Sequence, residues 1–344
     1  MKLLSIFPIF IILFYSTNFF FIKKKILLDN HNLSTHKKFL GKNHVPLSGG
    51  ILFFFLIFFY FENLFFLDSI FYFSILIIGL LSDTNKLTSP KKRIILQAII
   101  VITYIYLSKI YINETRVLFL DKLLDDNLGI KIVFTSICIL ILINGFNFID
   151  GTNTLAGGYA TIVSLALLIF LFENSSEFEI KNIQYILCFS IIFLFFNFFS
   201  KTFLGDGGSY LISTVIGIIC IKFSINFEYV ISPFFIALLL WYPALENLFS
   251  ILRRVFYHKK YLNLADNYHL HHLIYIYISK KFKNSVITNP LTGIIINTII
   301  FIFIYISLKF ANQTSLLIAL IILKTFVYTL TYLYLINIKN KLEN

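Results

Sequence analysis

Carboxylates, amides and glycines gather in short polar stretches between the long apolar runs of this chain. The central stretch reads Asn-Gly-Phe-Asn-Phe-Ile-Asp-Gly-Thr-Asn-Thr-Leu-Ala-Gly-Gly over residues 144–158, with apolar runs on both sides. Ionisable and amide groups at membrane depth cost several kcal/mol unless they pair or face water, so a functional role is expected. Glycines let the backbone leave a helix and approach a ligand. We interpret this stretch as one wall of a polar site that binds metal and phosphate at a membrane face.

A second polar stretch, at residues 203–209, reads Phe-Leu-Gly-Asp-Gly-Gly-Ser and has glycine on both sides of Asp206. It begins a new apolar run, so Asp206 would lie beside free backbone amides at a helix N-terminus. That geometry suits a divalent metal that bridges phosphate oxygens. A plain turn is the alternative.

A third stretch begins with Ser82-Asp83 at the end of an apolar run and continues with the basic residues Lys91, Lys92 and Arg93. A carboxylate followed by basic residues suits a lipid phosphate and its activator. A simple helix cap is the alternative for Asp83.

The last stretch contains an arginine pair and, further on, three histidines: Arg253, Arg254, His269, His271 and His272. Paired arginines can grip phosphates bidentately. Histidines at i, i+2 and i+3 cannot all share one helix face, so we expect a turn or loop there. A zinc site would need more ligands, so imidazoles that contact phosphate or sugar fit better.

The first loop is basic and ends in Pro-Leu-Ser-Gly-Gly at residues 46–50. The glycine pair would allow close helix packing or approach of the backbone to a ligand. A solvated basic loop is the alternative.

Composition identifies the elements that must hold these stretches. The chain has 344 residues, of which 58% are hydrophobic and 13% charged, with a mean hydropathy of +0.84. These values exclude a soluble domain and predict transmembrane helices. The net charge of +12 favours anionic headgroups and phosphorylated substrates over nucleic acid. The three cysteines lie inside apolar runs and indicate neither a disulfide framework nor a zinc site.

We predict an all-α, polytopic membrane bundle of about 10–11 transmembrane helices, which forms one domain over residues 1–344. The expected spans are 3–22, 46–66, 68–81, 94–110, 130–145, 157–172, 183–200, 209–224, 230–250, 291–309 and 315–337. The first is taken as a membrane helix rather than a signal peptide, because lysines follow it and no small-residue cleavage site does.

Charge predicts the orientation of the bundle. Lys and Arg accumulate on the cytoplasmic side, and loops two spans apart lie on the same side. The loops that carry the polar stretches hold most of the basic residues, and the other loops are richer in acid. We therefore expect the N-terminus outside, the C-terminus in the cytoplasm, and all the motifs on the cytoplasmic face. Asp125-Asp126 resembles a metal-binding pair but would lie on the outer face, as part of a solvated loop.

The motifs together resemble those of the polyprenyl-phosphate N-acetylhexosamine-1-phosphate transferases, glycosyltransferase family 4, relatives of the phospho-N-acetylmuramoyl-pentapeptide transferase. The resemblance rests on Asn-x-x-Asn-x-x-Asp-Gly at 144–151, Phe-x-Gly-Asp-x-Gly-Ser at 203–209 and His-x-His-His at 269–272. It extends over roughly residues 26–275. Each motif alone is weak, but their order and shared membrane face are jointly specific.

The resemblance implies a reaction in which polyprenyl (undecaprenyl) phosphate attacks the β-phosphorus of a UDP-N-acetylhexosamine. UMP leaves, and the sugar stays on a lipid diphosphate. The family uses Mg2+, with Mn2+ possible. We expect UDP-GlcNAc or a related amino sugar, a place at the start of O-antigen-like surface polysaccharide synthesis, and location in the inner (plasma) membrane. A homodimer is possible.

The resemblance also implies residue roles. Asp206 would be the principal metal ligand, Asn147 would help to hold the metal, and Asp150 would sit beside it. Asp83 matches the second Asp of the family's carboxylate pair, which is proposed to orient or deprotonate the lipid phosphate. Asp83, Asp150 and Asp206 would thus be catalytic.

The substrate-binding residues implied by the resemblance are Lys92, Arg93, Asn144, Phe203, Arg253, Arg254, His269, His271 and His272. Lys92 or Arg93 would grip the lipid phosphate, and Phe203 would stack on uracil. The arginine pair and the histidines would bind the nucleotide diphosphate and the sugar.

The chain departs from the family pattern at two places. Ser82 stands where the family has the first Asp of the pair, and Asn153-Thr154 stand where many members repeat Asp-Gly. A catalytically impaired family member is therefore one alternative. However, a phosphomonoester has a second pKa of about 6, so the lipid phosphate is already a dianion near neutral pH and a base is not strictly needed. A membrane transporter of an anionic solute is another alternative, but its motifs should reach both faces.

Overall fold

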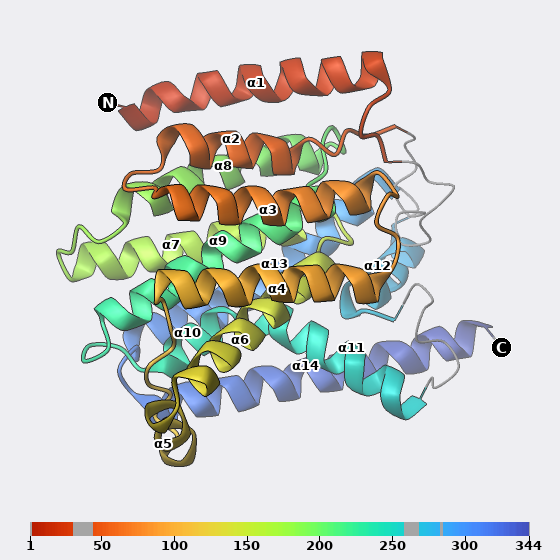
Figure 1. Ribbon diagram of the computed structural model, residues 1–344. Coiled ribbons are helices and arrows are strands. Elements are labelled where there is room, and N and C mark those ends of the chain that lie inside the picture. The colour runs from red at the N-terminus through yellow and green to blue at the C-terminus, as the bar shows by residue number, and fades with distance from the viewer. Residues whose placement is uncertain (1, 30–43, 258–267, 283–284, 344) are drawn as a thin grey trace.

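The computed structural model describes residues 2–29, 44–257, 268–282 and 285–343. Within these ranges the regular structure is helical (Figure 1), with one isolated β-bridge between Leu28 and Pro46. The helices are α1 (Lys2–Lys24), α2 (Gly49–Tyr60), α3 (Phe66–Asp83), α4 (Pro90–Ser108), α5 (Leu118–Asp126), α6 (Leu128–Ile149), α7 (Leu155–Glu173), α8 (Ile180–Phe198), α9 (Gly205–Asn226), α10 (Pro233–Leu239), α11 (Trp241–Tyr257), α12 (Leu270–Lys281), α13 (Ser285–Lys309) and α14 (Thr314–Glu343).

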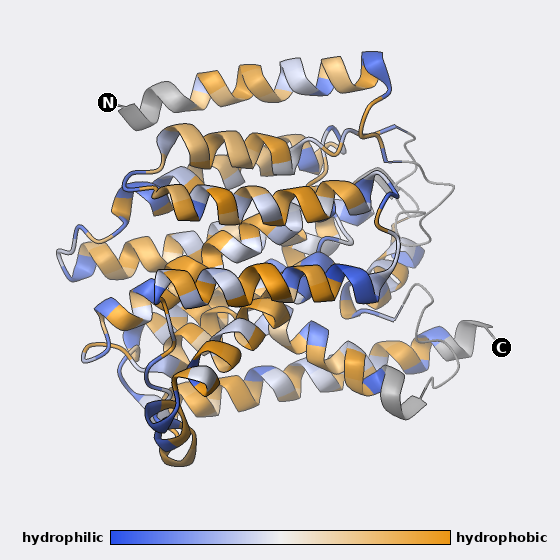
Figure 2. Cartoon of the chain, viewed as in Figure 1, coloured by the Kyte–Doolittle hydropathy of each residue, from blue (hydrophilic) through white to orange (hydrophobic). Residues whose placement is uncertain are grey.

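The helices form a polytopic membrane bundle, which confirms the predicted fold class. In the described part of the chain, eight helices are long and apolar enough to cross a membrane, or nine if the bent pair α10–α11 counts as one span. Two further predicted spans correspond to α2 and α4, which lie alongside α3 in Figure 1. The first has only 12 residues, far fewer than the predicted 46–66, and the second carries three basic residues in its first turn, after Pro90. In Figure 2 hydrophobic colour follows the helices and hydrophilic colour gathers at their ends.

The bundle is built around α9, which is the most deeply buried of the candidate membrane helices in the described part of the chain. Glycines let neighbouring helices touch its backbone directly. A Cβ on Gly50 of α2 would overlap with the backbone of Gly208, and a Cβ on Gly79 of α3 would overlap with the backbone of Gly207. Small residues of this kind allow helix backbones to approach closely inside membranes. Of the two roles predicted for the glycine pair at 49–50, the structure therefore shows close helix packing.

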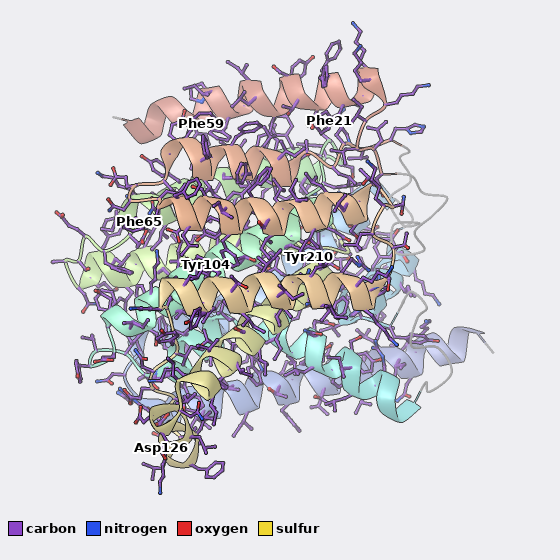
Figure 3. All side chains as sticks on the ribbon, viewed as in Figure 1. Phe21, Phe59, Phe65, Tyr104, Asp126 and Tyr210 are labelled. Atoms are coloured by element: carbon purple, nitrogen blue, oxygen red, sulfur yellow. The ribbon has the colours of Figure 1, made fainter. Side chains whose placement is uncertain are left out.

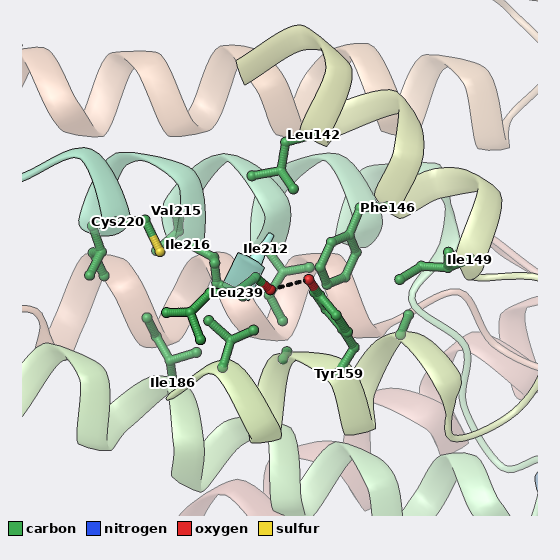
Figure 4. Close-up of a cluster of buried hydrophobic side chains, with 14 of the residues drawn as sticks. Leu142, Phe146, Ile149, Tyr159, Ile186, Ile212, Val215, Ile216, Cys220 and Leu239 are labelled. Atoms are coloured by element: carbon green, nitrogen blue, oxygen red, sulfur yellow. Dashed lines mark hydrogen bonds between the residues drawn. The ribbon is translucent and has the colours of Figure 1, made fainter. Parts of the chain in front are cut away.

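The predicted span 230–250 is broken at Leu240, where α10 and α11 meet at 70°. A helix end leaves backbone carbonyls without intrahelical partners. Buried side chains from distant helices supply the missing donors. Tyr159 of α7 donates its hydroxyl to the Leu239 carbonyl (Figure 4), and Nζ of Lys324 in α14 lies 3.4 Å from the Leu238 carbonyl oxygen.

The short helix α5 was not predicted, and it ends with Asp125-Asp126. Figure 3 places Asp126 at the edge of the molecule, well away from Tyr210 of α9. Figure 1 shows α5 at the end of the bundle opposite α12, which carries two of the three histidines. The acidic pair is thus separate from the other motifs, as the sequence predicted.

Candidate active site

The carboxylate of Asp206 lies at the centre of a polar cluster formed by four helices. Its Oδ2 atom lies 2.8 Å from Nη1 of Arg93 in α4 and accepts a hydrogen bond of 2.5 Å from Ser82 of α3. Its Oδ1 atom accepts a 2.7 Å hydrogen bond from the side-chain amide of Asn147 in α6. Arg93 also donates to the Ser82 hydroxyl at 2.7 Å and to the Tyr210 hydroxyl at 3.3 Å. Three of the sequence motifs therefore meet at one carboxylate.

Asp83 fixes the start of the helix that carries Asp206. One carboxylate oxygen accepts from the backbone N–H of Asp206 at 2.8 Å, and the other accepts from that of Gly207 at 3.0 Å. The carboxylate thus caps α9 from the end of α3, where negative charge is stabilised by the exposed N–H groups and the helix dipole. Gly205 has φ +70°, and a Cβ there would lie 2.7 Å from Asp83 Oδ2. Asp83 is therefore a helix cap, which was the alternative predicted from the sequence. The helix that it caps is α9, which carries Asp206.

The three histidines form a second cluster, and only two of them are helical. His269 precedes α12 in an extended conformation, whereas His271 and His272 lie in its first turn. The expectation of a turn or loop was therefore wrong for the last two. All three rings are buried, and the centroids of His271 and His272 lie 4.2 Å apart.

Glu246 of α11 holds this cluster in place. It is 1% exposed, lies 3.0 Å from Nδ1 of His269, and accepts from the backbone N–H of Leu270 at 3.3 Å. This residue was not among those predicted from the sequence. A carboxylate inside the predicted span 230–250 was the available signal, because such groups are costly in a membrane unless they pair.

The two clusters meet at the C-terminal end of α6. Asn147 contacts Asp206, and the next residue, Phe148, has its ring centroid 5.0 Å from that of His269. Consecutive Cα atoms are about 3.8 Å apart, so the two groups share one end of the bundle. Asp150 ends α6 one turn later, and a Cβ on the following Gly151 would overlap with the ring of His271.

The remaining predicted substrate-binding residues lie around this centre. Asn144 donates to Gln97 of α4 at 3.2 Å, one turn deeper in the bundle than Asn147. Lys92 is exposed in the first turn of α4, so the structure brings Arg93, and not Lys92, to Asp206. Phe203 is 6% exposed and packs with Val45 and Leu47, so stacking on uracil stays a prediction.

The structure describes the side chain of only one residue of the arginine pair. Arg253 is buried and donates to the Tyr268 carbonyl and, at 2.9 Å, to the Tyr332 hydroxyl. It therefore links Tyr268, the residue before His269, to α14, and a nucleotide contact stays a prediction. The side chain of Arg254 lies outside the described residues.

The residues at the departure, Asn153 and Thr154, lie in the loop between α6 and α7 and are held by neighbouring helices. The backbone N–H of Asn153 donates to Asn289 at 2.8 Å, and that of Thr154 donates to Asn197. The Thr154 hydroxyl donates to the Pro290 carbonyl at 2.8 Å. These bonds tie the loop between α6 and α7 to α8 and α13, so this part of the motif fixes the loop.

The oxygen donors around Asp206 fit Mg2+. Among the residues that the structure describes, no group of three or more His, Cys, Asp or Glu side chains could hold a metal ion. Mg2+ does not require one, because it commonly takes one or two carboxylates together with substrate phosphates and water. Asp206 supplies a carboxylate, and a 180° turn of the Asn147 amide would present its oxygen at the same place.

Comparison with known proteins agrees with this geometry. Residues 65–224 match the family model described as glycosyl transferase family 4. The chain is 30% identical over 277 residues to the phospho-N-acetylmuramoyl-pentapeptide-transferase of Prochlorococcus marinus (strain MIT 9215), covering 73% of this chain and 76% of that protein. The chain therefore belongs to glycosyl transferase family 4 and is a phosphotransferase of that family.

Two further relatives carry sugar-transferase names. The undecaprenyl-phosphate alpha-N-acetylglucosaminyl 1-phosphate transferase of Thermotoga maritima is 29% identical over 257 residues, covering 74% of each chain. A probable undecaprenyl-phosphate N-acetylglucosaminyl 1-phosphate transferase of Bacillus subtilis (strain 168) is 25% identical over 206 residues, covering 58% of this chain and 55% of that protein.

Proposed function

We propose that the protein transfers an N-acetylhexosamine-1-phosphate from a UDP-sugar to polyprenyl phosphate and releases UMP. The observation that carries this proposal is the convergence on Asp206. Arg93, Ser82 and Asn147 contact its carboxylate, and Asp83 clamps the helix end beneath it. A central carboxylate that is contacted by a guanidinium and neutral donors suits the positioning and charge neutralisation that phosphoryl transfer requires.

In this reaction an oxygen of the lipid phosphate attacks the β-phosphorus of the UDP-sugar, and the bond from that phosphorus to the UMP oxygen breaks. Asp206 and Asn147, with Asp150 beside them, would hold Mg2+ or Mn2+, and the bound ion would supply positive charge next to the diphosphate. Arg93 would bind the lipid phosphate. Asp83 would act chiefly by holding Asp206 in place, since both of its oxygens already accept backbone N–H groups.

The histidine cluster would face the nucleotide diphosphate and sugar. His269 lies beside Phe148, the neighbour of Asn147, so a donor substrate bound there would reach the metal site. Glu246 would orient His269 through Nδ1 and leave Nε2 for the substrate. Arg253 would support this arrangement through the Tyr268 carbonyl.

We further propose that the site lies on the cytoplasmic face of the inner (plasma) membrane, with the N-terminus outside and the C-terminus inside. The excess of Lys and Arg in the motif-bearing loops supports this orientation. Residues 1–344 would form one domain, with a homodimer possible. UDP-GlcNAc leads the candidate donors because two relatives are named for N-acetylglucosaminyl transfer. An O-antigen-like or other cell-surface polymer would follow.

The test uses membranes that contain the full-length protein. UMP release from UDP-N-acetylhexosamines should require both polyprenyl phosphate and Mg2+, and the mass of the lipid product should identify the sugar. UMP release that is independent of the lipid would contradict the proposal. Failure of every UDP-sugar, with the protein correctly folded, would favour an impaired family member, as the Ser82 departure suggests.

A further inference from the structure

Gln97 is a buried polar side chain on the membrane-deep side of the site. It is fully buried at 0% exposure, and its Oε1 atom accepts from Asn144 at 3.2 Å. Its Nε2 atom has no hydrogen-bond partner among the described residues. A buried donor without an acceptor is costly, and such groups in native proteins call for an explanation.

Arg93 has a similar unmet donor. Its Nη1 atom contacts Asp206, Ser82 and Tyr210, but its Nε atom is buried without a partner in the described part of the chain. Residues 93 and 97 are four apart in α4 and therefore share one helix face. Two unmet N–H donors thus occupy successive turns of one face of α4, and the residue that carries one of them, Arg93, contacts the central carboxylate.

An anion with several oxygens would satisfy both donors, and a phosphate is such an anion. The position along the helices indicates which phosphate. Gln97 lies one turn further along α4 than Arg93, about 5.4 Å along the axis, and Asn144 lies one turn before Asn147 in α6. Both shifts lead away from the end of α6 where the histidines lie. The pair therefore faces the substrate that enters from the membrane rather than the nucleotide.

We propose that Gln97, together with Nε of Arg93, binds the phosphate of the lipid acceptor on the side of Asp206 opposite the histidine cluster. This inference rests on the proposed function and adds a substrate-binding residue to it. Asn144 holds the Gln97 amide by its oxygen, and this hydrogen bond directs the amide nitrogen toward the phosphate.

The test compares Gln97→Leu and Gln97→Glu in the purified full-length protein. Gln97→Glu keeps an oxygen that accepts from Asn144 but replaces the donor with a negative group. The hydrogen bond with Asn144 would therefore survive Gln97→Glu, whereas a phosphate contact would not. Ser190→Ala is the matched control, because Ser190 is likewise a fully buried polar residue without a partner in the described chain, but it lies on α8.

Undecaprenyl phosphate, with undecaprenol as the phosphate-free probe, is titrated while thermal stabilisation is recorded, and KM is measured for both substrates. We expect both Gln97 variants to need about tenfold more undecaprenyl phosphate for half-saturation. Their KM for the UDP-sugar should stay within about twofold of wild type, and Ser190→Ala should match wild type.

Normal undecaprenyl phosphate binding by both Gln97 variants would overturn this inference and leave the proposed function intact. An equal rise in KM for the UDP-sugar would also overturn it, since the effect would then be a general distortion of the site. A wild-type protein that responds equally to undecaprenyl phosphate and undecaprenol would overturn the proposed function and this inference together.

Discussion

Replacing Asp83 by Asn distinguishes two possible roles of this carboxylate: a clamp that holds the start of α9 in place, and a general base for the lipid phosphate. The carboxylate accepts two backbone N–H groups at the start of α9, at 2.8 and 3.0 Å. Asparagine keeps one acceptor, but its NH2 group would face the other N–H. A hydrogen bond to a charged group contributes roughly 1.5–3 kcal/mol, and a charge at a helix N-terminus roughly 0.3–1 kcal/mol. We expect Asp83→Asn to cost about 2 kcal/mol or more at this helix end.

The loss would move the Asp206 carboxylate relative to Arg93 and Asn147. A displacement of about 1 Å can reduce a rate by about 100-fold. We therefore expect UMP release to fall by about that factor, together with a lower unfolding temperature in detergent. Asp126→Asn is the matched control, because Asp126 is exposed and far from the site, and it should change neither quantity.

The pH profile distinguishes the two roles. The second pKa of a phosphomonoester is about 6, so the lipid phosphate becomes a dianion without help as the pH rises toward 8. If Asp83 served mainly as a base, the Asp83→Asn defect would shrink between pH 6 and pH 8. The clamp predicts a defect of constant size over this range. Full activity at every pH, with an unchanged unfolding temperature, would refute the clamp.

Three other substitutions test the same centre. Asp206→Asn should reduce Mg2+-dependent UMP release by at least about 100-fold, because the carboxylate at the centre of the cluster loses its charge; retained activity would remove the metal assignment. Ser82→Ala should cost only about 1 kcal/mol of stability and less than about tenfold in activity, since Arg93 still contacts Asp206 directly; a loss as large as that of Asp206→Asn would show that the hydroxyl is essential. Gly151→Ala should disable sugar transfer by pushing His271 aside, while Gly129→Ala, whose added carbon meets only the Asn127 side chain, should not; equal activity of the two variants would contradict this packing.

Much of the fold could be predicted from composition, because a continuous apolar run has few structural options in a membrane. Where a polar stretch ended a run, the helix boundaries lay within a few residues of the predicted ones: the span expected to end at 81 ends at Asp83, and the span expected to begin at 209 begins at Gly205. The span expected to end at 145 continues to Ile149, because the first part of the central polar stretch stays helical. The break at Leu240 could not be predicted in this way. The apolar sequence continues across it, and the freed carbonyls find donors in Tyr159 and Lys324, which are far away in the chain.

The sequence could predict which residues form the site better than it could predict which of them contact one another. The motif carboxylates and amides Asp206, Asn147 and Asp83 do meet, because each lies near a helix end on the same side of the bundle. That Asp83 caps a helix more than 120 residues further along depends on the packing of α3 against α9, which local spacing does not contain. The same limit hid the contact of Glu246 with His269.

The glycine contacts around α9 have a consequence for how this protein can change by mutation. At Gly50 and Gly79 the neighbouring atoms are backbone rather than side chain. In an ordinary core a larger residue can be accommodated when a neighbouring side chain is replaced by a smaller one. Backbone atoms, however, cannot be removed by substitution. Compensating pairs are therefore excluded at these two positions, and directed evolution should recover glycine there even when every surrounding side chain is randomised.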